Sequence, residues 1–233
     1  MGSNHCIQPT FRPCGLHAAD AGRYALKDDE QLISEIRTGD CAAIEIPLGF
    51  SVFCDMDGTL VDTDYANYLA YRRAVIEATY GTYDLEFADE RINRESLKKQ
   101  LPSLTPMQIE AVVALKARYF NEFLSNTRLN TELGQLITDH QTRNTMVLVT
   151  CSREKRAVEV LKHHKLVGCF SRLICWESLP HGGAQNKYEN AMRLTGANQN
   201  AVIVLESDNV GIEQAVLAGV HRKNIYRIIP GRG

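Results

Sequence analysis

The sequence contains no long hydrophobic run and no marked excess of charge of either sign. No apolar stretch approaches the ~20 residues that a helix needs to cross a bilayer. The amino-terminal residues do not combine a basic segment with an apolar one, so we expect no secretory signal. The net charge of −2 gives no electrostatic support for binding nucleic acid or a membrane surface. We therefore expect neither of these as a partner.

Paired cysteines are also missing. The chain has seven cysteines, an odd number, and contains no Cys-x-x-Cys pair. Cys54 and Cys175 lie within apolar, strand-like runs, where a free thiol behaves as a small hydrophobic side chain. Because scattered thiols of this kind favour a reducing compartment over a disulfide framework, we predict a cytoplasmic protein.

The composition is that of a soluble globular protein, with 233 residues, 44% hydrophobic and 23% charged. This length suits one domain, or a core with a smaller inserted unit. Residues 1–48 are rich in turn formers and predict an N-terminal extension of unknown role. Within the extension we expect a short helix from Asp28 to Arg37 and a short strand from Ala42 to Ile46. Its two histidines and two cysteines before residue 20 match no zinc spacing.

From Phe50 onwards, short apolar runs alternate with helical segments. The runs are rich in aliphatic and β-branched residues, as buried parallel strands are, and span residues 50–54, 146–149, 173–176, 201–205 and 225–229. The helices have readable ends: Ser152 is expected to cap one, and Asn186 and Gly196 to begin and end the next. The pattern predicts an α/β fold, with a Rossmann-like three-layer core around a parallel sheet.

The alternation stops between residues 64 and 139, where only helical patterns occur. One of these helices is expected to open at Thr105 and Pro106, with Gln108 completing a capping box. An all-helical insert after the first strand predicts a cap domain over residues 64–139. The catalytic core then comprises residues 49–63 and 140–233.

Two aspartates follow the first strand, in the segment Asp55-Met56-Asp57-Gly58-Thr59-Leu60-Val61-Asp62. Carboxylates at positions i and i+2 face one ligand only if the chain turns sharply, and Gly58 can take the positive φ that such a turn needs. Ligands of open parallel sheets bind outside the carboxyl ends of the strands, where this pair would lie. One carboxylate can then act as nucleophile and the other as general acid and base. A divalent cation would neutralise part of their charge.

This segment resembles the first motif of the haloacid dehalogenase superfamily, in which DxDGT is followed by two hydrophobic residues and an aspartate. The resemblance implies that Asp55 forms an aspartyl-phosphate, and that Asp57 protonates the leaving group and then activates water. It also implies Mg²⁺ as cofactor, held by Asp55 and by the backbone carbonyl of Asp57. Gly58 and Thr59 are expected to contact the substrate. The helical insert matches the subclass that includes phosphoglycolate phosphatases and beta-phosphoglucomutases.

Thr150 resembles the second motif of this family. It ends an apolar strand, at the position where family members place a Ser or Thr that hydrogen-bonds the transferring phosphoryl group. Cys151 and Ser152 follow it and are expected to bind substrate, since the backbone N–H groups of the next helix start near an anion. A plain helix cap is the alternative interpretation of this segment.

Lys187 takes the place of the cation that the family uses to hold the nucleophile and the phosphoryl oxygens together. The usual form of this motif, Lys followed closely by Pro, is absent, and Lys187 instead stands at the start of a helix. Arg153 and His181 are weaker candidates for the same role. A solvated surface lysine is the alternative.

The segment Glu206-Ser207-Asp208 resembles the last motif of the family, but with a changed order. The acid that usually binds Mg²⁺ is replaced by Ser207, and an aspartate occupies the usual Ser position. We predict that Glu206 and Asp208 hold the metal together with Asp55 and Asp57. Alternatively, Asp208 only caps the next helix.

These residues predict a Mg²⁺-dependent phosphatase that hydrolyses a small phosphorylated metabolite through an aspartyl-phosphate. A phosphomutase shares every residue named, and a non-catalytic binding module on the same fold is the alternative from another class. A carbon-directed dehalogenase is disfavoured because such members lack the acid at Asp57. A second anionic group of the substrate could meet an arginine of the cap, the candidates being Arg72, Arg73, Arg91, Arg94 and Arg118. The sequence names neither the substrate nor the oligomeric state.

Overall fold

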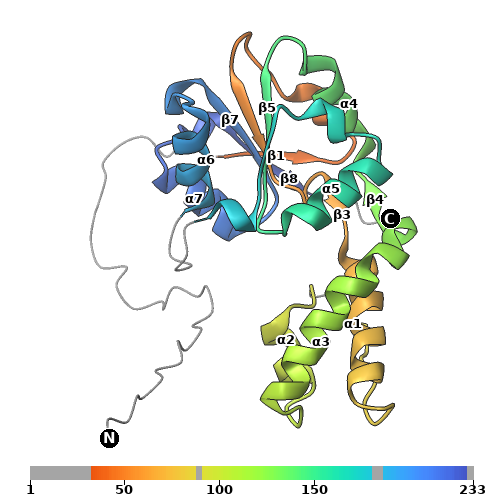
Figure 1. The fold of residues 1–233 in the computed structure, drawn as a ribbon. Helices are drawn as coiled ribbons and strands as arrows, with labels where there is room; N and C mark the ends of the chain where they lie inside the picture. Colours follow the sequence, from red (N-terminus) through yellow and green to blue (C-terminus); the bar gives the residue numbers. More distant parts are fainter. Residues whose placement is uncertain (1–32, 88–90, 180–185, 230–233) are drawn as a thin grey trace, which may run out of the picture.

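A six-stranded parallel sheet forms the centre of the protein (Figure 1). The computed structural model describes residues 33–87, 91–179 and 186–229. Across the sheet the strands are β1 (Ser34–Arg37), β8 (Ile225–Ile229), β7 (Val202–Glu206), β2 (Ser51–Cys54), β5 (Thr145–Val149) and β6 (Arg172–Ile174). The predicted α/β fold with a parallel sheet is confirmed.

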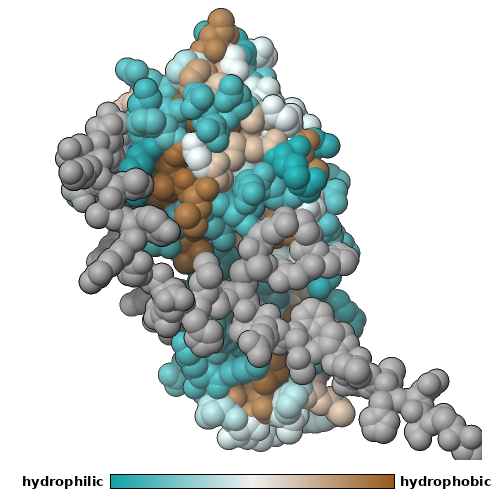
Figure 2. All heavy atoms as spheres, turned by 90° about the vertical axis from the view of Figure 1, so that its left-hand side faces the viewer, coloured by the Kyte–Doolittle hydropathy of each residue, from teal (hydrophilic) through white to brown (hydrophobic). Residues whose placement is uncertain are grey.

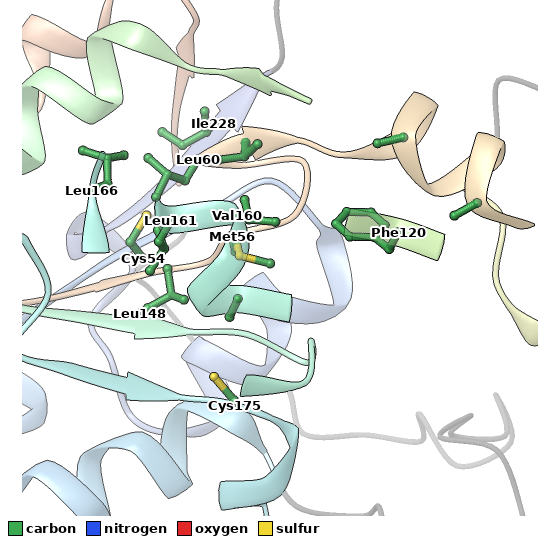
Figure 3. Close-up of a cluster of buried hydrophobic side chains, with 14 of the residues drawn as sticks. Cys54, Met56, Leu60, Phe120, Leu148, Val160, Leu161, Leu166, Cys175 and Ile228 are labelled. Carbon is green, nitrogen blue, oxygen red and sulfur yellow. The ribbon is translucent and has the colours of Figure 1, made fainter. Parts of the chain in front are cut away.

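Each central strand divides its side chains between two apolar layers. In β2, Val52 and Cys54 belong to one buried cluster and Phe53 to the other, because successive side chains of a strand point to opposite faces. The first cluster is covered by α4 (Thr131–His140) and α5 (Glu154–His163), the second by α6 (Lys187–Thr195) and α7 (Asn209–Leu217). Figure 3 shows part of the first cluster, in which Cys54 and Leu148 of the sheet pack near Val160 and Leu161.

The strand β1 corrects one expectation about the amino-terminal segment. The predicted helix from Asp28 to Arg37 is wrong over Ser34–Arg37, which pairs with β8 and places Ile36 opposite Ile228. The predicted strand from Ala42 to Ile46 is also wrong, since Cys41–Ala43 forms the 3-10 helix η1. Thr38 adds to this contact: its hydroxyl donates to the carbonyl of Ile229, which lies 191 residues further along the chain. The histidines and cysteines before residue 20 lie outside the described residues.

The helical unit that follows β2 contains α1 (Asp64–Ala78), α2 (Arg94–Gln100), α3 (Pro106–Tyr119) and the 3-10 helix η2 (Phe120–Asn126). The predicted capping box is confirmed, because Thr105 accepts from the N–H of Gln108 while the Gln108 side chain accepts from Thr105. Figure 1 shows α1, α2 and α3 projecting from the end of the sheet as a separate group. A short antiparallel ribbon, β3 (Val61–Asp62) with β4 (Arg128–Leu129), links this group to the core.

The helix α4 lies with the core and not with the projecting helices (Figure 1). Its Leu133 and Ile137 are buried in the first apolar cluster, and Glu132 accepts from the backbone N–H groups of Gly39 and Cys41. We therefore propose that the cap ends near residue 127, earlier than the expected boundary at residue 139. In the sequence α4 has the pattern of an amphipathic helix like the others of the insert, and this pattern does not indicate that it packs against the core.

The remaining elements are short. They are the 3-10 helices η3 (Val167–Cys169), η4 (Trp176–Ser178), η5 (Gln199–Ala201) and η6 (Arg222–Asn224).

On the side that carries α6 and α7, the coloured residues of Figure 2 are mostly hydrophilic, with apolar ones in separate groups. Among the described residues, no helix has the length and apolar content needed to span a bilayer.

Candidate active site

Charged side chains gather at the carboxyl edge of the sheet. Asp55 follows β2, Glu206 ends β7, and Lys187 begins α6. All three are buried, with exposed fractions of 6%, 0% and 7%. Buried charges require partners because taking an ion out of water is costly, so the contacts among these residues define the site.

Lys187 bridges the two buried carboxylates. Its Nζ lies 2.7 Å from Oδ1 of Asp55 and 2.7 Å from Oε2 of Glu206. Glu206 also accepts from the hydroxyl of Tyr188 at 2.7 Å, and its Oε1 accepts from the backbone N–H groups of Ser207 and Asp208. The structure thus brings Lys187 to Asp55, and the alternative of a solvated lysine does not describe it.

The carboxylates carry more negative charge than Lys187 offsets. Burial, with the charge of Glu206, raises the pKa of Asp55 to about 7, although Lys187 opposes this shift. Burial by itself would lower the pKa of Lys187, but the charges of Asp55 and Glu206 raise it above its usual value. Lys187 therefore stays protonated, and the pair of carboxylates would be stabilised by a further cation.

The turn after Asp55 brings the motif close to the end of β7. Gly58 has a φ of +84°, and a Cβ added there would lie 3.3 Å from Oγ of Ser207. The hydroxyl of Thr59 is 3.3 Å from Oδ2 of Asp55 and 2.9 Å from Oγ of Ser207. The glycine is required both by the left-handed backbone and by this close approach.

Asp57 lies apart from the lysine bridge, within a shell of donors. Its carboxylate accepts from the hydroxyls of Thr63 and Ser152, both at 2.6 Å. The guanidinium groups of Arg156 and Arg91 lie 2.8 and 3.0 Å from its Oδ1. Burial would raise the pKa of Asp57, but the charges of the two arginines and the two hydroxyls hold it well below its usual range. In this structure Asp57 is therefore an ionised acceptor.

Two of these donors, Thr63 and Arg156, are not among the site residues predicted from the sequence, and Ser152 has a contact that the sequence did not predict. Ser152 was expected to cap α5, but the N-cap is Arg153, and the Ser152 hydroxyl donates to Asp57 instead. Arg156 stands four residues after Ser152, a spacing that places both on one side of a helix start. This spacing is the feature of the sequence from which Arg156 could have been predicted as a site residue.

Thr150 and Cys151 differ in exposure. Thr150 is buried, and its Oγ1 accepts from the backbone N–H of Ser152 at 3.0 Å, while Cys151 is exposed. In the described part of the chain no hydrogen bond joins Thr150 to Asp55. Of the weaker candidates for the cation, Arg153 is exposed on the N-cap of α5, and His181 lies outside the described residues.

The metal-binding prediction is only partly matched by the geometry. Asp208 is exposed at the N-cap of α7, and no hydrogen bond of its side chain is found among the described residues. Those residues also contain no cluster of three acidic, histidine or cysteine side chains arranged around one point. Asp55 and Glu206 remain as two carboxylates on one lysine. Mg²⁺ is commonly held by one or two carboxylates, with waters and substrate phosphate completing the shell, so this donor set fits Mg²⁺.

The fold defines a class of protein, a three-layer α/β core with a helical unit inserted after its second strand. The sequence profile described as "Haloacid dehalogenase-like hydrolase" matches residues 52–225. The chain therefore belongs to the haloacid dehalogenase-like hydrolase family, and the resemblance and the predicted class of enzyme are confirmed.

Individual relatives are more distant. A "Phosphorylated carbohydrates phosphatase" from Thermotoga maritima is 25% identical over 189 residues, covering 77% of this chain and 85% of the relative. A predicted phosphoglycolate phosphatase from Haemophilus somnus matches the structure with a TM-score of 0.62 at 16% identity, covering 80% of this chain and 86% of the other. A beta-phosphoglucomutase from Clostridium difficile matches with a TM-score of 0.57 at 18% identity, over 74% and 82%. These two structures share the fold of the chain.

Proposed function

We propose that this protein is a Mg²⁺-dependent phosphatase that hydrolyses a small phosphate monoester through an aspartyl-phosphate at Asp55. The observation that carries the proposal is the buried lysine bridge, in which one Nζ lies 2.7 Å from both Asp55 and Glu206. Such a bridge fixes the orientation of a carboxylate nucleophile and brings positive charge to the place where phosphoryl oxygens would bind.

In the first step Asp55 attacks phosphorus. Its Oδ1 is held by Lys187, whereas the hydrogen bond that Oδ2 receives within the described residues is the long 3.3 Å one from Thr59, so we assign the attack to Oδ2. An Oδ2–P bond forms as the bond from phosphorus to the leaving alcohol oxygen breaks, and that oxygen takes the proton carried by Asp57. Thr150, Cys151 and Ser152, at the end of the neighbouring strand β5, are assigned to bind the phosphoryl group with Gly58 and Thr59.

In the second step water attacks the aspartyl-phosphate and Asp57 accepts its proton. The donors that keep Asp57 ionised suit this role, because a general base must be deprotonated. The acid role of the first step requires Asp57 to carry a proton, and therefore requires at least one of its donors to move away. Cleavage of the O–P bond releases phosphate and restores Asp55.

Mg²⁺ is assigned to Asp55 and Glu206, with the backbone carbonyl of Asp57 as the family resemblance implies. When bound, it offsets negative charge on the carboxylates and on the phosphoryl oxygens. Ser207 contributes a neutral hydroxyl at the position where the family pattern has an acid, so we expect weaker metal binding than a further carboxylate would give. Asp208 is dropped from the proposed ligands because its side chain is exposed.

The substrate is proposed to be a phosphorylated carbohydrate or a similar small metabolite. The curated relative from Thermotoga maritima, named for phosphorylated carbohydrates, supports this class. A phosphomutase would use the same residues but return the phosphoryl group to a sugar phosphate instead of releasing phosphate. Measurement of phosphate release separates the two.

The test is release of p-nitrophenol from p-nitrophenyl phosphate, with Mg²⁺ or with chelator. We expect turnover only with the metal, and none by Asp55→Asn. Asp139→Asn is the matched control, because Asp139 is an exposed residue of α4 that accepts a hydrogen bond from Gln135 and lies outside the site, and it should keep wild-type activity. Turnover by Asp55→Asn would contradict the nucleophile assignment, and a silent wild type would favour a binding module.

A further inference from the structure

Tyr188 places its hydroxyl on the carboxylate oxygen that also holds Lys187. The phenol oxygen lies 2.7 Å from Oε2 of Glu206, and Nζ of Lys187 lies 2.7 Å from the same oxygen. Lys187 and Tyr188 are consecutive residues in the first turn of α6. One carboxylate oxygen therefore receives two donors from neighbouring positions of one helix, and the proposed reaction gives no task to the second of them.

The hydroxyl of Tyr188 is held at a fixed place. The side chain is fully buried and belongs to the second apolar cluster, together with Phe53 of β2. The first turn of α6 is in turn fixed to α7, because the Asn186 side chain donates to the carbonyl of Gln214 and the N–H of Lys187 donates to the Gln214 side chain. Since a closely packed ring leaves its hydroxyl little freedom, Tyr188 is a rigid donor.

The carboxylate of Glu206 is also held in place by groups other than Tyr188. Its Oε1 accepts from the backbone N–H groups of Ser207 and Asp208, at 3.0 and 3.1 Å. The helix α7 approaches so closely that a Cβ added at Gly211 would overlap the carboxylate. Because Glu206 has no room to follow Lys187, the strength of its pull on the ammonium decides where Nζ lies.

Lys187 is shared equally between two carboxylates. Its Nζ lies 2.7 Å from Oδ1 of Asp55 and 2.7 Å from Oε2 of Glu206. A hydrogen bond from a neutral hydroxyl offsets part of the negative charge of Oε2, and so weakens the attraction of Glu206 for the ammonium. The ring of Tyr188 also supports the ammonium, since its centre lies 5.1 Å from Nζ. Loss of the hydroxyl would draw Nζ towards Glu206 and away from Asp55.

We propose that Tyr188 is a positioning residue: through Glu206, its hydroxyl keeps Lys187 directed at the nucleophile. This inference rests on the proposed function, in which Lys187 holds Oδ1 of Asp55 while Oδ2 attacks phosphorus. Tyr188 itself takes no part in the chemical steps. The alternative is that a buried phenol donates to the nearest acceptor without consequence for the reaction. The two interpretations differ in what the hydroxyl does to turnover.

Tyr188→Phe removes the hydroxyl and keeps the ring. Because a hydrogen bond to a charged group is commonly worth about ten- to a hundredfold, we expect kcat for p-nitrophenyl phosphate at saturating Mg²⁺ to fall by about tenfold. KM should change little, because the residues assigned to the phosphoryl group at the end of β5 stay in place. Tyr119→Phe is the matched control: this hydroxyl also donates to a glutamate, Glu77, within the helical unit, and its loss should leave kcat unchanged. A wild-type kcat in Tyr188→Phe would overturn the inference.

A second background shows whether Tyr188 acts through Glu206. Glu206→Gln keeps the shape of the side chain but removes the charge that could draw Lys187 away from Asp55. We therefore expect Tyr188→Phe to change kcat little in this background, so that the two substitutions are not additive. An equal loss in both backgrounds would overturn the inference. If Tyr188→Phe does not fold alone, the comparison within Glu206→Gln decides by itself, an unchanged kcat supporting the inference and a further loss overturning it.

Crystal structures grown in chelator test the geometry without any turnover. We expect Nζ of Lys187 to leave hydrogen-bonding distance of Asp55 in Tyr188→Phe. Wild type and the Tyr119→Phe control should keep this contact. If the wild type releases no phosphate, the proposed function fails, and these structures still decide the inference: a contact between Lys187 and Asp55 that persists in Tyr188→Phe overturns it.

Discussion

Replacing Asp55 with asparagine should stabilise the metal-free protein at neutral and alkaline pH. Asp55 is buried beside Glu206, and its pKa is raised from the ordinary 3.8 to about 7. Asparagine has nearly the same shape as the protonated aspartate and never carries the charge. The substitution therefore removes the cost of ionising Asp55 in the folded state.

The direction in which wild-type stability changes with pH follows from proton linkage. Between the unfolded pKa near 3.8 and the folded pKa near 7, the folded state binds more protons at Asp55 than the unfolded state, so wild-type stability falls as pH rises through this window. Once the pH is above the folded pKa of about 7, this loss of wild-type stability is complete. A shift of ~3 pKa units corresponds to about 4 kcal/mol at 1.36 kcal/mol per unit. At pH 4 the difference shrinks to below about 1 kcal/mol.

Thermal unfolding in chelator measures the effect. For a chain of this size ~1 kcal/mol moves Tm by about 2–4 °C, so Asp55→Asn should unfold on the order of 10 °C higher than wild type at pH 8, and nearly together with it at pH 4. Mg²⁺ should raise the wild-type Tm more than that of the variant, because the proposed metal site includes the carboxylate of Asp55. An Asp55→Asn protein as labile as wild type at pH 8 in chelator would refute the argument, since it would mean that Lys187 alone offsets both carboxylates.

Three further substitutions probe the site. In Gly211→Ala the added methyl group would overlap the carboxylate of Glu206, so we expect p-nitrophenyl phosphate turnover to fall by more than about tenfold and stability by about 1–3 kcal/mol. In Thr63→Val the loss of the 2.6 Å hydrogen bond to Asp57 should lower p-nitrophenyl phosphate turnover, because Asp57 loses a group that orients it, while the acid limb of the pH–rate profile, which the ionisation of Asp55 sets, stays in place. In Ser207→Asp an acid returns to the position that the family pattern gives it, and calorimetry should show tighter Mg²⁺ binding than in wild type.

Each of these expectations has its own contrary result. Gly168→Ala is the control for Gly211→Ala, because an added methyl group there meets nothing within 4 Å, and equal losses in both would remove the role given to Glu206. Movement of the acid limb in Thr63→Val would show that Asp57, and not Asp55, sets that limb. Unchanged or weaker Mg²⁺ affinity in Ser207→Asp would place the metal away from residue 207.

The core strands were predictable from the sequence because each carries its own local signal. The runs at β2, β5, β7 and β8 are apolar and β-branched, and a strand buried on both faces needs no partner information to be recognised. The strand β1 carries no such signal: of its residues Ser34–Arg37 only Ile36 is buried. Its strand conformation comes from pairing with β8, and this contact cannot be read from local propensity.

The candidate site divides in the same way. Asp55, Asp57 and Gly58 lie in one continuous motif whose spacing carries its own chemistry. The two arginines around Asp57 come from α5 and from the segment before α2, and the sequence gives no indication that these segments meet. Asp208 is predicted as a metal ligand because acids near a strand end attract cations. The backbone turns after Glu206, however, and leaves Asp208 exposed on the N-cap of α7.

Chemical trapping of the phosphorylated residue tests the central claim most directly. Protein turning over p-nitrophenyl phosphate with Mg²⁺ is quenched in acid and reduced with borohydride, which converts an aspartyl-phosphate to homoserine, and peptide masses then locate the change. We predict homoserine at position 55, absent without substrate. Modification of another residue, or sustained phosphate release with Asp55 never modified, would contradict the account.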